Sequence, residues 1–174
     1  MDAGLAAVIA GASGAGGAAL AAFGTSFAML RQAKIQRESA HQLWLRNHQQ
    51  QAFEELVIAV RRWKDFLAGP NQEFARPLLA DGSEDLQPYF AEQEVRSAAV
   101  AAGIARVSLL ADSETGSLAF ILGSAMTDLG IAVVKRKVGA ADAPTEEEVH
   151  QLWEASHTAS TDFAWSAKQT LQEA

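Results

Sequence analysis

The sequence predicts an all-α protein in which an N-terminal transmembrane helix continues into a stalk, followed by an antiparallel helical bundle. Three observations support this fold class. Residues 5–30 form a run of 26 residues without an ionisable side chain. Basic residues follow this run directly, beginning with Arg31. From residue 53 to the C-terminus, apolar residues recur three and four positions apart, which is typical of helices with one buried face.

The bulk composition limits the classes of protein to which the chain can belong. Its 174 residues are enough for one domain with a substantial core. The absence of cysteine excludes a disulfide framework, a thiolate zinc site and a cysteine nucleophile, and it fits a reducing compartment. The net charge of −7 argues against a nucleic-acid-binding surface, so we expect no direct nucleic-acid partner.

The first element, residues 1–30, is expected to be a transmembrane helix. A helix over residues 5–30 is roughly 39 Å long at about 1.5 Å per residue, and the hydrocarbon core of a bilayer is about 30 Å thick. Arg31, Lys34 and Arg37 follow the apolar run. Because the basic end of a span normally stays in the cytoplasm, these three charges are expected to anchor the inner end. We therefore expect a plasma-membrane protein with its N-terminus outside and the bulk of the chain in the cytoplasm.

Small residues recur four positions apart within this segment. Such rows allow helix backbones to approach closely in lipid, so the sequence predicts self-association of the span and a homo-oligomer. The alternative is that a compositional bias toward Ala and Gly produced the rows. The residues assigned to span self-association are Gly11, Gly14, Ala15, Ala18, Ala19 and Ala22.

Other interpretations of the same segment fit less well, with one exception. A secretory signal peptide requires a positively charged start, and here only Asp2 precedes the apolar run. Residues 11–17 lack the following lysine of a phosphate-binding loop, and residues 14–19 lack the last glycine of a dinucleotide-binding fingerprint. The exception is a soluble helix that packs against itself in an assembly, and this alternative remains open.

The second element, residues 31–52, is expected to be a basic stalk helix. Residues 31–64 contain seven basic and three acidic side chains, whereas the rest of the chain beyond them contains seven basic and seventeen acidic ones. Asn47 and the glutamines at 49–51 are polar on every side of a helix, which suits a solvated stalk better than a core.

The third element, residues 53–174, is expected to be a cytoplasmic helical bundle interrupted by a loop at 69–90. The first helix should end where Gly69 is followed by Pro70, which is a strong helix stop. A helix then returns near Phe90 and ends near Ala111. This helix keeps a mostly small face made of Val95, Ala98, Ala99, Ala102, Ala105, Arg106 and Leu109.

The next helix is expected to begin with Asp112 or Ser113 as its N-cap and to close at the basic triplet 135–137. The triplet suits the negative end of the helix dipole better than it suits anionic lipid or nucleic acid. A strand is the alternative for 118–122 and 131–134, but the helical spacing is continuous through both. The inner side of this helix is expected to be Leu118, Ile121, Leu122, Ala125, Leu129 and Val133.

The last helix is expected to start at a capping box, with Thr145 at the N-cap and Glu148 at N3. Three returning helices and the distal part of the first then make a four-helix bundle. The inner face of the last helix is expected to be Val149, Leu152, Trp153, Ser156, Ser160, Phe163, Ala167 and Leu171.

No residue pattern indicates catalysis, a cofactor or a bound metal. His41, His150 and His157 each follow a glutamate by three positions, as in di-iron carboxylate proteins. On a helical wheel His150 and His157 lie on a flank of the apolar face, and their glutamates turn away from it. Solvated surface pairs are therefore the default interpretation, and a carboxylate–histidine metal protein is the alternative. We assign no catalytic, cofactor-binding or metal-binding residue.

The N-terminal third resembles a group of uncharacterised single-span membrane proteins from high-GC actinobacteria. The resemblance lies in the opening run MDAGLAAVI at residues 1–9 and in the basic, glutamine-rich helix at 31–51, which contains Trp44-Leu45-Arg46. Some members of that group are labelled as similar to the spread proteins of Streptomyces conjugative plasmids. The resemblance implies a plasma-membrane protein and suggests a role in DNA spread, and it carries no functional residues.

From these features we expect a membrane-anchored helical scaffold or interaction protein without catalytic activity. It would bind a protein partner of unknown identity and self-associate through its span. One alternative, suggested by the resemblance, is an accessory protein of conjugative or intercellular DNA transfer. The other is a soluble helical bundle that assembles through its Ala/Gly-rich N-terminal helix.

Overall fold

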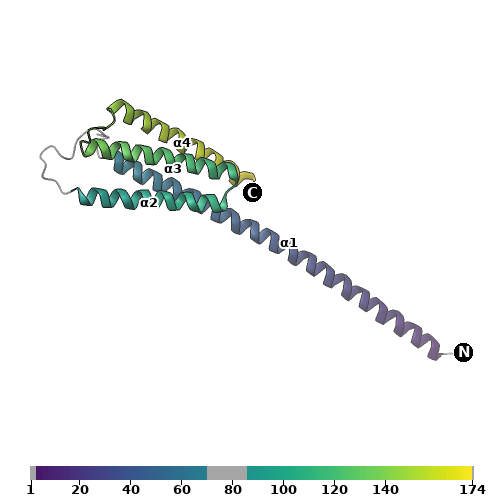
Figure 1. The fold of residues 1–174 in the computed structure, drawn as a ribbon. Helices are drawn as coiled ribbons and strands as arrows, with labels where there is room; N and C mark the ends of the chain where they lie inside the picture. The colour runs from purple at the N-terminus through teal and green to yellow at the C-terminus, as the bar shows by residue number, and fades with distance from the viewer. Residues whose placement is uncertain (1–2, 70–85, 174) are drawn as a thin grey trace. The chain divides into compact units, whose positions relative to one another are not determined.

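The computed structural model describes residues 3–69 and 86–173, and within these ranges it is all-α with no strand. Its helices are α1 (Ala3–Ala68), α2 (Gln87–Leu110), α3 (Ser113–Lys137) and α4 (Glu146–Glu173) (Figure 1). The predicted all-α class is thus confirmed, and the strands considered for residues 118–122 and 131–134 are absent because α3 runs through both.

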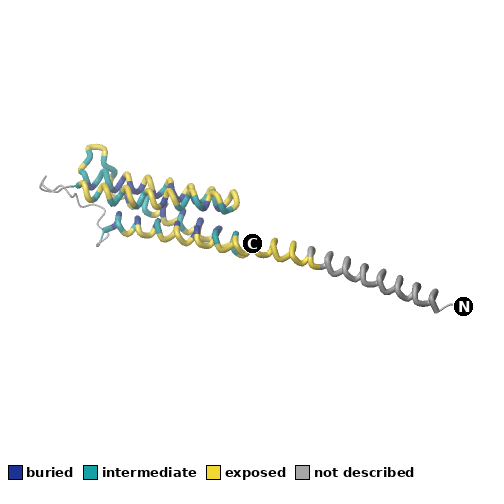
Figure 2. Tube along the Cα trace, turned by 90° about the horizontal axis from the view of Figure 1, so that it is seen from below, coloured by how far each residue is buried: buried dark blue, intermediate teal, exposed yellow. Residues whose placement is uncertain are grey.

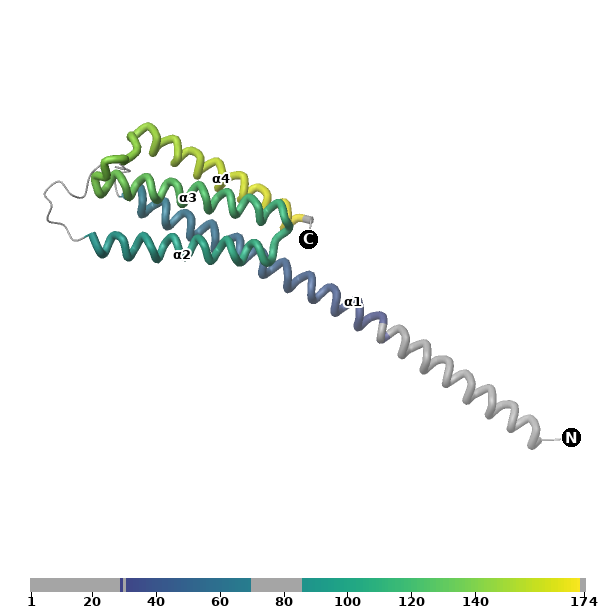
Figure 3. The backbone as a smooth tube through the Cα atoms, viewed as in Figure 1, coloured from purple at the N-terminus to yellow at the C-terminus, as the bar shows by residue number. Residues whose placement is uncertain are grey.

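The chain divides into two compact units, Met1–Trp44 and Leu45–Ala174. The first unit contains only the N-terminal part of α1, and its described side chains, Met29 and residues 31–44, are all exposed. The second unit is a four-helix bundle formed by the rest of α1 with α2, α3 and α4 (Figure 3). Helical backbone over residues 3–30 agrees with the predicted helix there.

The bundle begins earlier along α1 than the sequence indicates. Gln49 is only 6% exposed, and Ala52 is fully buried, although both fall in the range 31–52 assigned to the stalk. The Gln49 amide Nε2 donates a hydrogen bond of 2.8 Å to the carbonyl of Leu110. This carbonyl belongs to the last turn of α2, where the helix provides no partner of its own. Gln49 is therefore a buried C-terminal cap for α2 and not a stalk residue.

The end of α1 agrees with the predicted helix stop. Gly69 has a φ of +66°, in the left-handed region that a residue with a Cβ adopts only at a cost. Its N–H donates to the carbonyl of Asp65 at 3.2 Å, which closes the last turn. The following loop prediction falls on residues 70–85, which lie outside the described residues. The next helix begins at Gln87 and not near Phe90, because Pro88 is well tolerated in a first helical turn.

The small face of α2 is not its buried face. Val100 and Val107 are the buried side chains of this helix, and Gly103 faces Leu56 of α1. A Cβ at Gly103 would lie 3.2 Å from the Cα of Leu56, so glycine allows the two helices to approach closely. Most of the predicted small face points outward instead. The exposed members are Val95, Ala98, Ala99, Ala102, Ala105 and Leu109.

Helix α3 is the most buried helix of the bundle, and both of its predicted ends are confirmed. Asp112 is the N-cap, and the helix closes at Lys137. Leu122, Leu129 and Val133 are fully buried as predicted, but Ile121 is 53% exposed. The buried side also includes Met126 and residues with little or no side chain, which admit neighbours from other helices. These small buried residues include Ala119, Gly123, Gly130 and Ala132.

Helix α4 follows the predicted pattern closely. The Thr145 N–H donates to Glu148 Oε2 at 2.7 Å, and the Glu148 N–H donates back to Thr145 Oγ1 at 3.2 Å, so the capping box is confirmed. Val149 and Phe163 are fully buried. The Phe163 ring meets that of Phe53 edge-on, with 5.9 Å between the ring centroids. In Figure 2 the buried residues lie on the sides of the helices that face one another within the bundle.

Candidate interaction surface

The residues predicted to mediate span self-association lie outside the side chains that the structure describes. They are Gly11, Gly14, Ala15, Ala18, Ala19 and Ala22. The predicted inside-anchoring charges Arg31, Lys34 and Arg37 are described, and all three are exposed. Lys34 forms a surface ion pair of 3.9 Å with Glu38 one helical turn later. Such exposed pairs contribute little to stability, so these cations are available to a charged surface.

A network of hydroxyl groups joins the start of α3 to the C-terminal half of α4. The Asp112 side chain accepts hydrogen bonds from the backbone N–H groups of Glu114 and Thr115, which caps the helix. Thr170 Oγ1 donates to Asp112 Oδ2 at 2.8 Å. The fully buried Thr115 hydroxyl lies 2.8 Å from Ser166 Oγ and 2.9 Å from Thr170 Oγ1. The network satisfies buried polar groups and fixes the register of α3 against α4.

The pKa of Asp112 predicts how this network depends on pH. Hydrogen bonds from the Thr115 N–H and the Thr170 hydroxyl favour the charged carboxylate and lower its pKa. A lowered folded-state pKa adds stability above the unfolded value, about 3.9 for Asp, and this stability is lost as the pH falls through the folded pKa. We expect the difference in free energy of unfolding between the wild type and Asp112→Asn to shrink as the pH falls from neutral to below about 3.

The measurement is urea unfolding at a series of pH values, followed by far-UV circular dichroism. Asp112→Asn is a suitable reference because asparagine also caps helices but does not titrate. Glu114→Gln, which changes a carboxylate at the neighbouring position, serves as the matched control. A difference between wild type and Asp112→Asn that stays constant down to about pH 2 would contradict the prediction.

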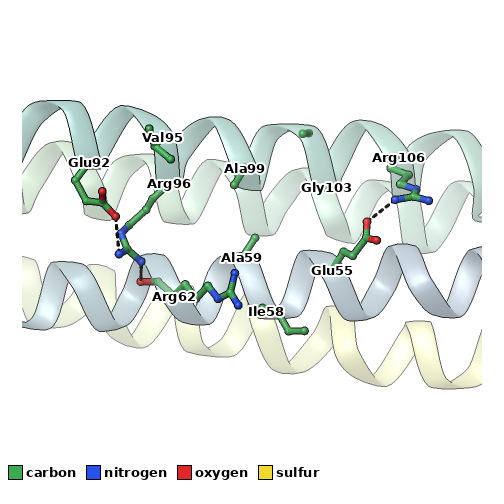
Figure 4. Close-up of a pocket in the computed structure, with 11 residues that line it drawn as sticks. Glu55, Ile58, Ala59, Arg62, Glu92, Val95, Arg96, Ala99, Gly103 and Arg106 are labelled. Atoms are coloured by element: carbon green, nitrogen blue, oxygen red, sulfur yellow. Dashed lines mark hydrogen bonds and ion pairs between the residues drawn. The ribbon is translucent and has the colours of Figure 1, made fainter.

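A groove with a volume of about 970 Å³ lies in the bundle surface between α1 and α2. Figure 4 shows Ala59 of α1 pointing toward α2 and Glu55 of α1 reaching toward Arg106, and Ala99 and Gly103 also line the groove on α2. Ile58, which is 47% exposed, also lines this groove. The groove is shallow because Gly103 brings the helices together below it, so it presents an apolar surface and not an enclosed site.

Charged residues border the groove in pairs. Arg106 Nη1 contacts Glu55 Oε2 at 2.5 Å, and Arg96 Nη2 contacts Glu92 Oε1 at 2.6 Å (Figure 4). Arg96 also donates to the carbonyl of Arg62 at 2.9 Å. Along α2, Glu92 and Arg106 therefore lie toward opposite ends of the groove, each with its side chain about half exposed. The sequence gives no direct signal for this arrangement, because it depends on which face of α2 packs against α1.

A second apolar groove of about 510 Å³ lies between α1 and α4. Phe53 and Val57 line it on α1, and Ala167 and Leu171 line it on α4. Large apolar side chains elsewhere on the bundle surface are also exposed, among them Phe120 at 71%, Ile131 at 52% and Trp165 at 63%. Contiguous apolar surfaces such as the two grooves are candidates for contact with another protein, whereas apolar residues exposed singly are common on soluble proteins.

The titratable residues do not converge on a reactive centre in the described part of the chain. His150 and His157 are exposed on α4, as the helical wheel predicts. Among the described residues no group of three or more His, Asp or Glu side chains is placed to hold a metal ion. Burial raises the pKa of Tyr89 to about 12, so this phenol stays neutral at physiological pH. Burial lowers the pKa of Lys64, and the nearby Glu154 carboxylate opposes this shift.

By length and composition, α3 (Ser113–Lys137) could cross a membrane, and it is the one such helix among the residues whose side chains the structure describes. Core helices of water-soluble bundles meet the same criterion. Leu122, Met126 and Leu129 of α3 are fully buried inside the bundle. Burial in the bundle therefore explains one side of this apolar helix, whereas Phe120, Ile121 and Ile131 on α3 are exposed.

The described residues thus define an all-α protein whose C-terminal unit is a four-helix bundle with exposed apolar grooves. Comparison of the chain with protein-family models, with curated proteins and with solved structures finds no match.

Proposed function

We propose that this chain is a membrane-anchored helical interaction protein, held in the plasma membrane by residues 5–30 and acting by binding a protein partner without catalysis. The observation that carries the proposal is the change of character along the single helix α1. Its first part has 26 consecutive residues without an ionisable group, and the side chains described from residue 31 to 44 are exposed and rich in charge. A helix that is apolar all round needs lipid or protein around it.

The direction of insertion follows from the charges that flank this segment. Arg31, Lys34 and Arg37 lie exposed within seven residues of its C-terminal side. Cations at this position favour retention on the cytoplasmic side, which places the bundle in the cytoplasm and the N-terminus outside. The interaction role is supported by the apolar grooves of the bundle and by exposed groups such as Phe120 and Trp165.

The proposal is tested by extraction of the full-length chain from membranes. We expect the protein to remain with the membrane pellet after washing with high salt and with carbonate, and to be released by detergent. The double variant Ala15→Arg/Ala19→Arg should move to the soluble fraction, since each arginine near the centre of a span costs about 2.5–3.5 kcal/mol of insertion free energy.

The matched control is Ala155→Arg/Ala164→Arg, two exposed alanines of α4 that the proposal places in water. This variant should fractionate like the wild type. Release of the wild-type chain by carbonate alone would contradict the proposal. That result would favour the soluble bundle that assembles through its Ala/Gly-rich helix, and size-exclusion chromatography without detergent would then show a large species.

A further inference from the structure

The outward face of α2 has a regular spacing that the bundle does not use. Its apolar residues are separated alternately by four and three positions, which is the heptad spacing of a coiled-coil seam. All of them are exposed, with Leu109 at 84% and Val95 at 64%, while Val100 and Val107 on the other side of α2 are buried in the core. The seam residues are Ala91, Val95, Ala98, Ala102, Ala105 and Leu109.

A solvated helix face normally carries charged and polar side chains. The seam has no charged or polar side chain from Ala91 to Leu109, and the charged residues of α2 lie on its flanks. The spacing of 3.5 residues keeps an apolar strip facing a second helix along its full length. Within the bundle the sides of α2 are occupied by α1 and α3, so the facing helix has to come from another molecule.

We infer that this seam binds the same seam of a second copy of the chain, with the two α2 helices antiparallel and related by a two-fold axis at the level of Val100. In this register Leu109 faces the partner's Ala91, Val95 faces the partner's Ala105, and Ala98 faces the partner's Ala102. Each large side chain thus meets a small one. The four alanines allow the helix backbones to approach closely, and the contact is isologous and closes as a dimer.

The charges on the flanks of the seam favour this partner and this direction. Glu92 and Arg106 lie on the flank next to α1, toward the two ends of the groove (Figure 4). Antiparallel pairing brings Glu92 of each copy close to the partner's Arg106, and both side chains are about half exposed and can reach across. On the other flank Glu94 meets the partner's Ser108. A parallel pair aligns no Glu with an Arg in this way.

The dimer extends the charge pairs that each copy already has. Arg106 holds Glu55, and Arg96 holds Glu92, so each end of the interface gathers two carboxylates and two guanidinium groups. The groove between α1 and α2 adjoins the seam, because Val95 and Ala102 line both, and it is partly covered by the second copy. The inference is independent of the membrane anchor, because every residue that it uses belongs to the unit Leu45–Ala174.

The absence of native cysteine makes disulfide trapping a direct test. Full-length Ala98→Cys and Ala102→Cys proteins carrying tags of different mass are mixed in detergent micelles and oxidised. A disulfide needs Cα atoms within about 7 Å, so we expect the mixed dimer to exceed the dimer formed by either variant alone. Ala155→Cys, an exposed alanine on α4, is the matched control and should form little dimer.

Two outcomes overturn the inference. Equal trapping by Ala155→Cys would mean that contact is random or occurs elsewhere, and preferential trapping of each variant with itself would mean a parallel pair. The two cysteine variants are also mixed with Ala15→Arg/Ala19→Arg present in both, which removes any association through residues 5–30. The mixed dimer should still exceed the dimer formed by either variant alone. Loss of this excess would mean that the N-terminal segment drives association, and this would also overturn the inference.

A charge in the seam provides an independent measurement. Ala102→Glu should weaken dimer formation in analytical ultracentrifugation by at least about tenfold, because two like charges face apolar surface near the two-fold axis. Ala155→Glu should have no effect, and circular dichroism should show that both variants keep the helix content of the wild type. A dimer that Ala102→Glu leaves unchanged would contradict the seam as the interface.

Discussion

Replacing Phe163 by alanine is expected to lower the free energy of unfolding of the bundle by about 3–5 kcal/mol. Phe163 is fully buried at the interface of α1 and α4, where its ring meets Phe53 edge-on. Truncation removes the transfer free energy of the ring, the edge-on contact and the contacts that line the resulting cavity. Small domains are stable by only about 5–15 kcal/mol, so this loss is a large part of the total.

The change is measured by urea unfolding of the full-length protein, followed by far-UV circular dichroism. Trp165→Ala is the matched control, since Trp165 lies two positions later on the same helix and is 63% exposed. Its loss should change the free energy of unfolding by less than about 1 kcal/mol, as expected for a surface substitution away from special features. Equal destabilisation by the two variants would contradict the placement of Phe163 in the core.

Replacing Thr115 by valine is expected to lower the free energy of unfolding by about 1–3 kcal/mol, although valine has nearly the same shape. The Thr115 hydroxyl is buried and lies within hydrogen-bond distance of Asp112, Ser166 and Thr170. Valine leaves the buried Ser166 hydroxyl without this partner, and an unsatisfied buried polar group costs its full desolvation.

Thr127→Val is the matched control for this prediction. Thr127 lies on the same helix, is exposed, and donates its hydroxyl hydrogen bond to the Gly123 carbonyl in the previous turn. Valine at this position should be nearly neutral because water can replace the lost hydrogen bond. If the same unfolding assay found Thr115→Val as mild as Thr127→Val, the network between α3 and α4 would contribute nothing to stability.

Several helix ends could be predicted because their signals are local. Gly69 ends α1 through its own left-handed backbone conformation, and Asp112 caps α3 through N–H groups two and three positions away. Thr145 and Glu148 satisfy each other's N–H groups within one turn. In each case the interacting groups lie within a few residues, so their spacing in the sequence specifies the contact.

The positions of Gln49 and of the α2 seam could not be predicted in this way. Gln49 is polar and flanked by polar residues, and only the proximity of the Leu110 carbonyl makes its burial favourable. The small face of α2 has a regular helical pattern, yet Val100 and Val107 on another face are the buried residues. Periodicity shows that a helix has an apolar strip, but a helix with two such strips can turn either one inward.

Some features of the candidate interaction surface could likewise be predicted from the sequence, and others depend on how the helices pack. The uncharged segment and the basic residues that follow it are properties of the sequence alone, because the partitioning of a helix into lipid depends on its composition and length. The groove between α1 and α2 arises from the close approach of Gly103 to Leu56, and these residues lie far apart in the chain. The pairing of Glu55 with Arg106 depends on the same approach.

The sequence by itself determined that this chain is helical, where most of its helices end, and which segment has no ionisable side chain. Those properties depend on backbone conformation, on hydrogen bonds over one or two turns and on summed hydrophobicity, which are all local. The tertiary structure decided which strip of α2 faces the core, that Gln49 is a buried cap, and that Thr115 joins α3 to α4. These outcomes depend on how side chains from distant segments fill shared space, and only packing resolves that competition.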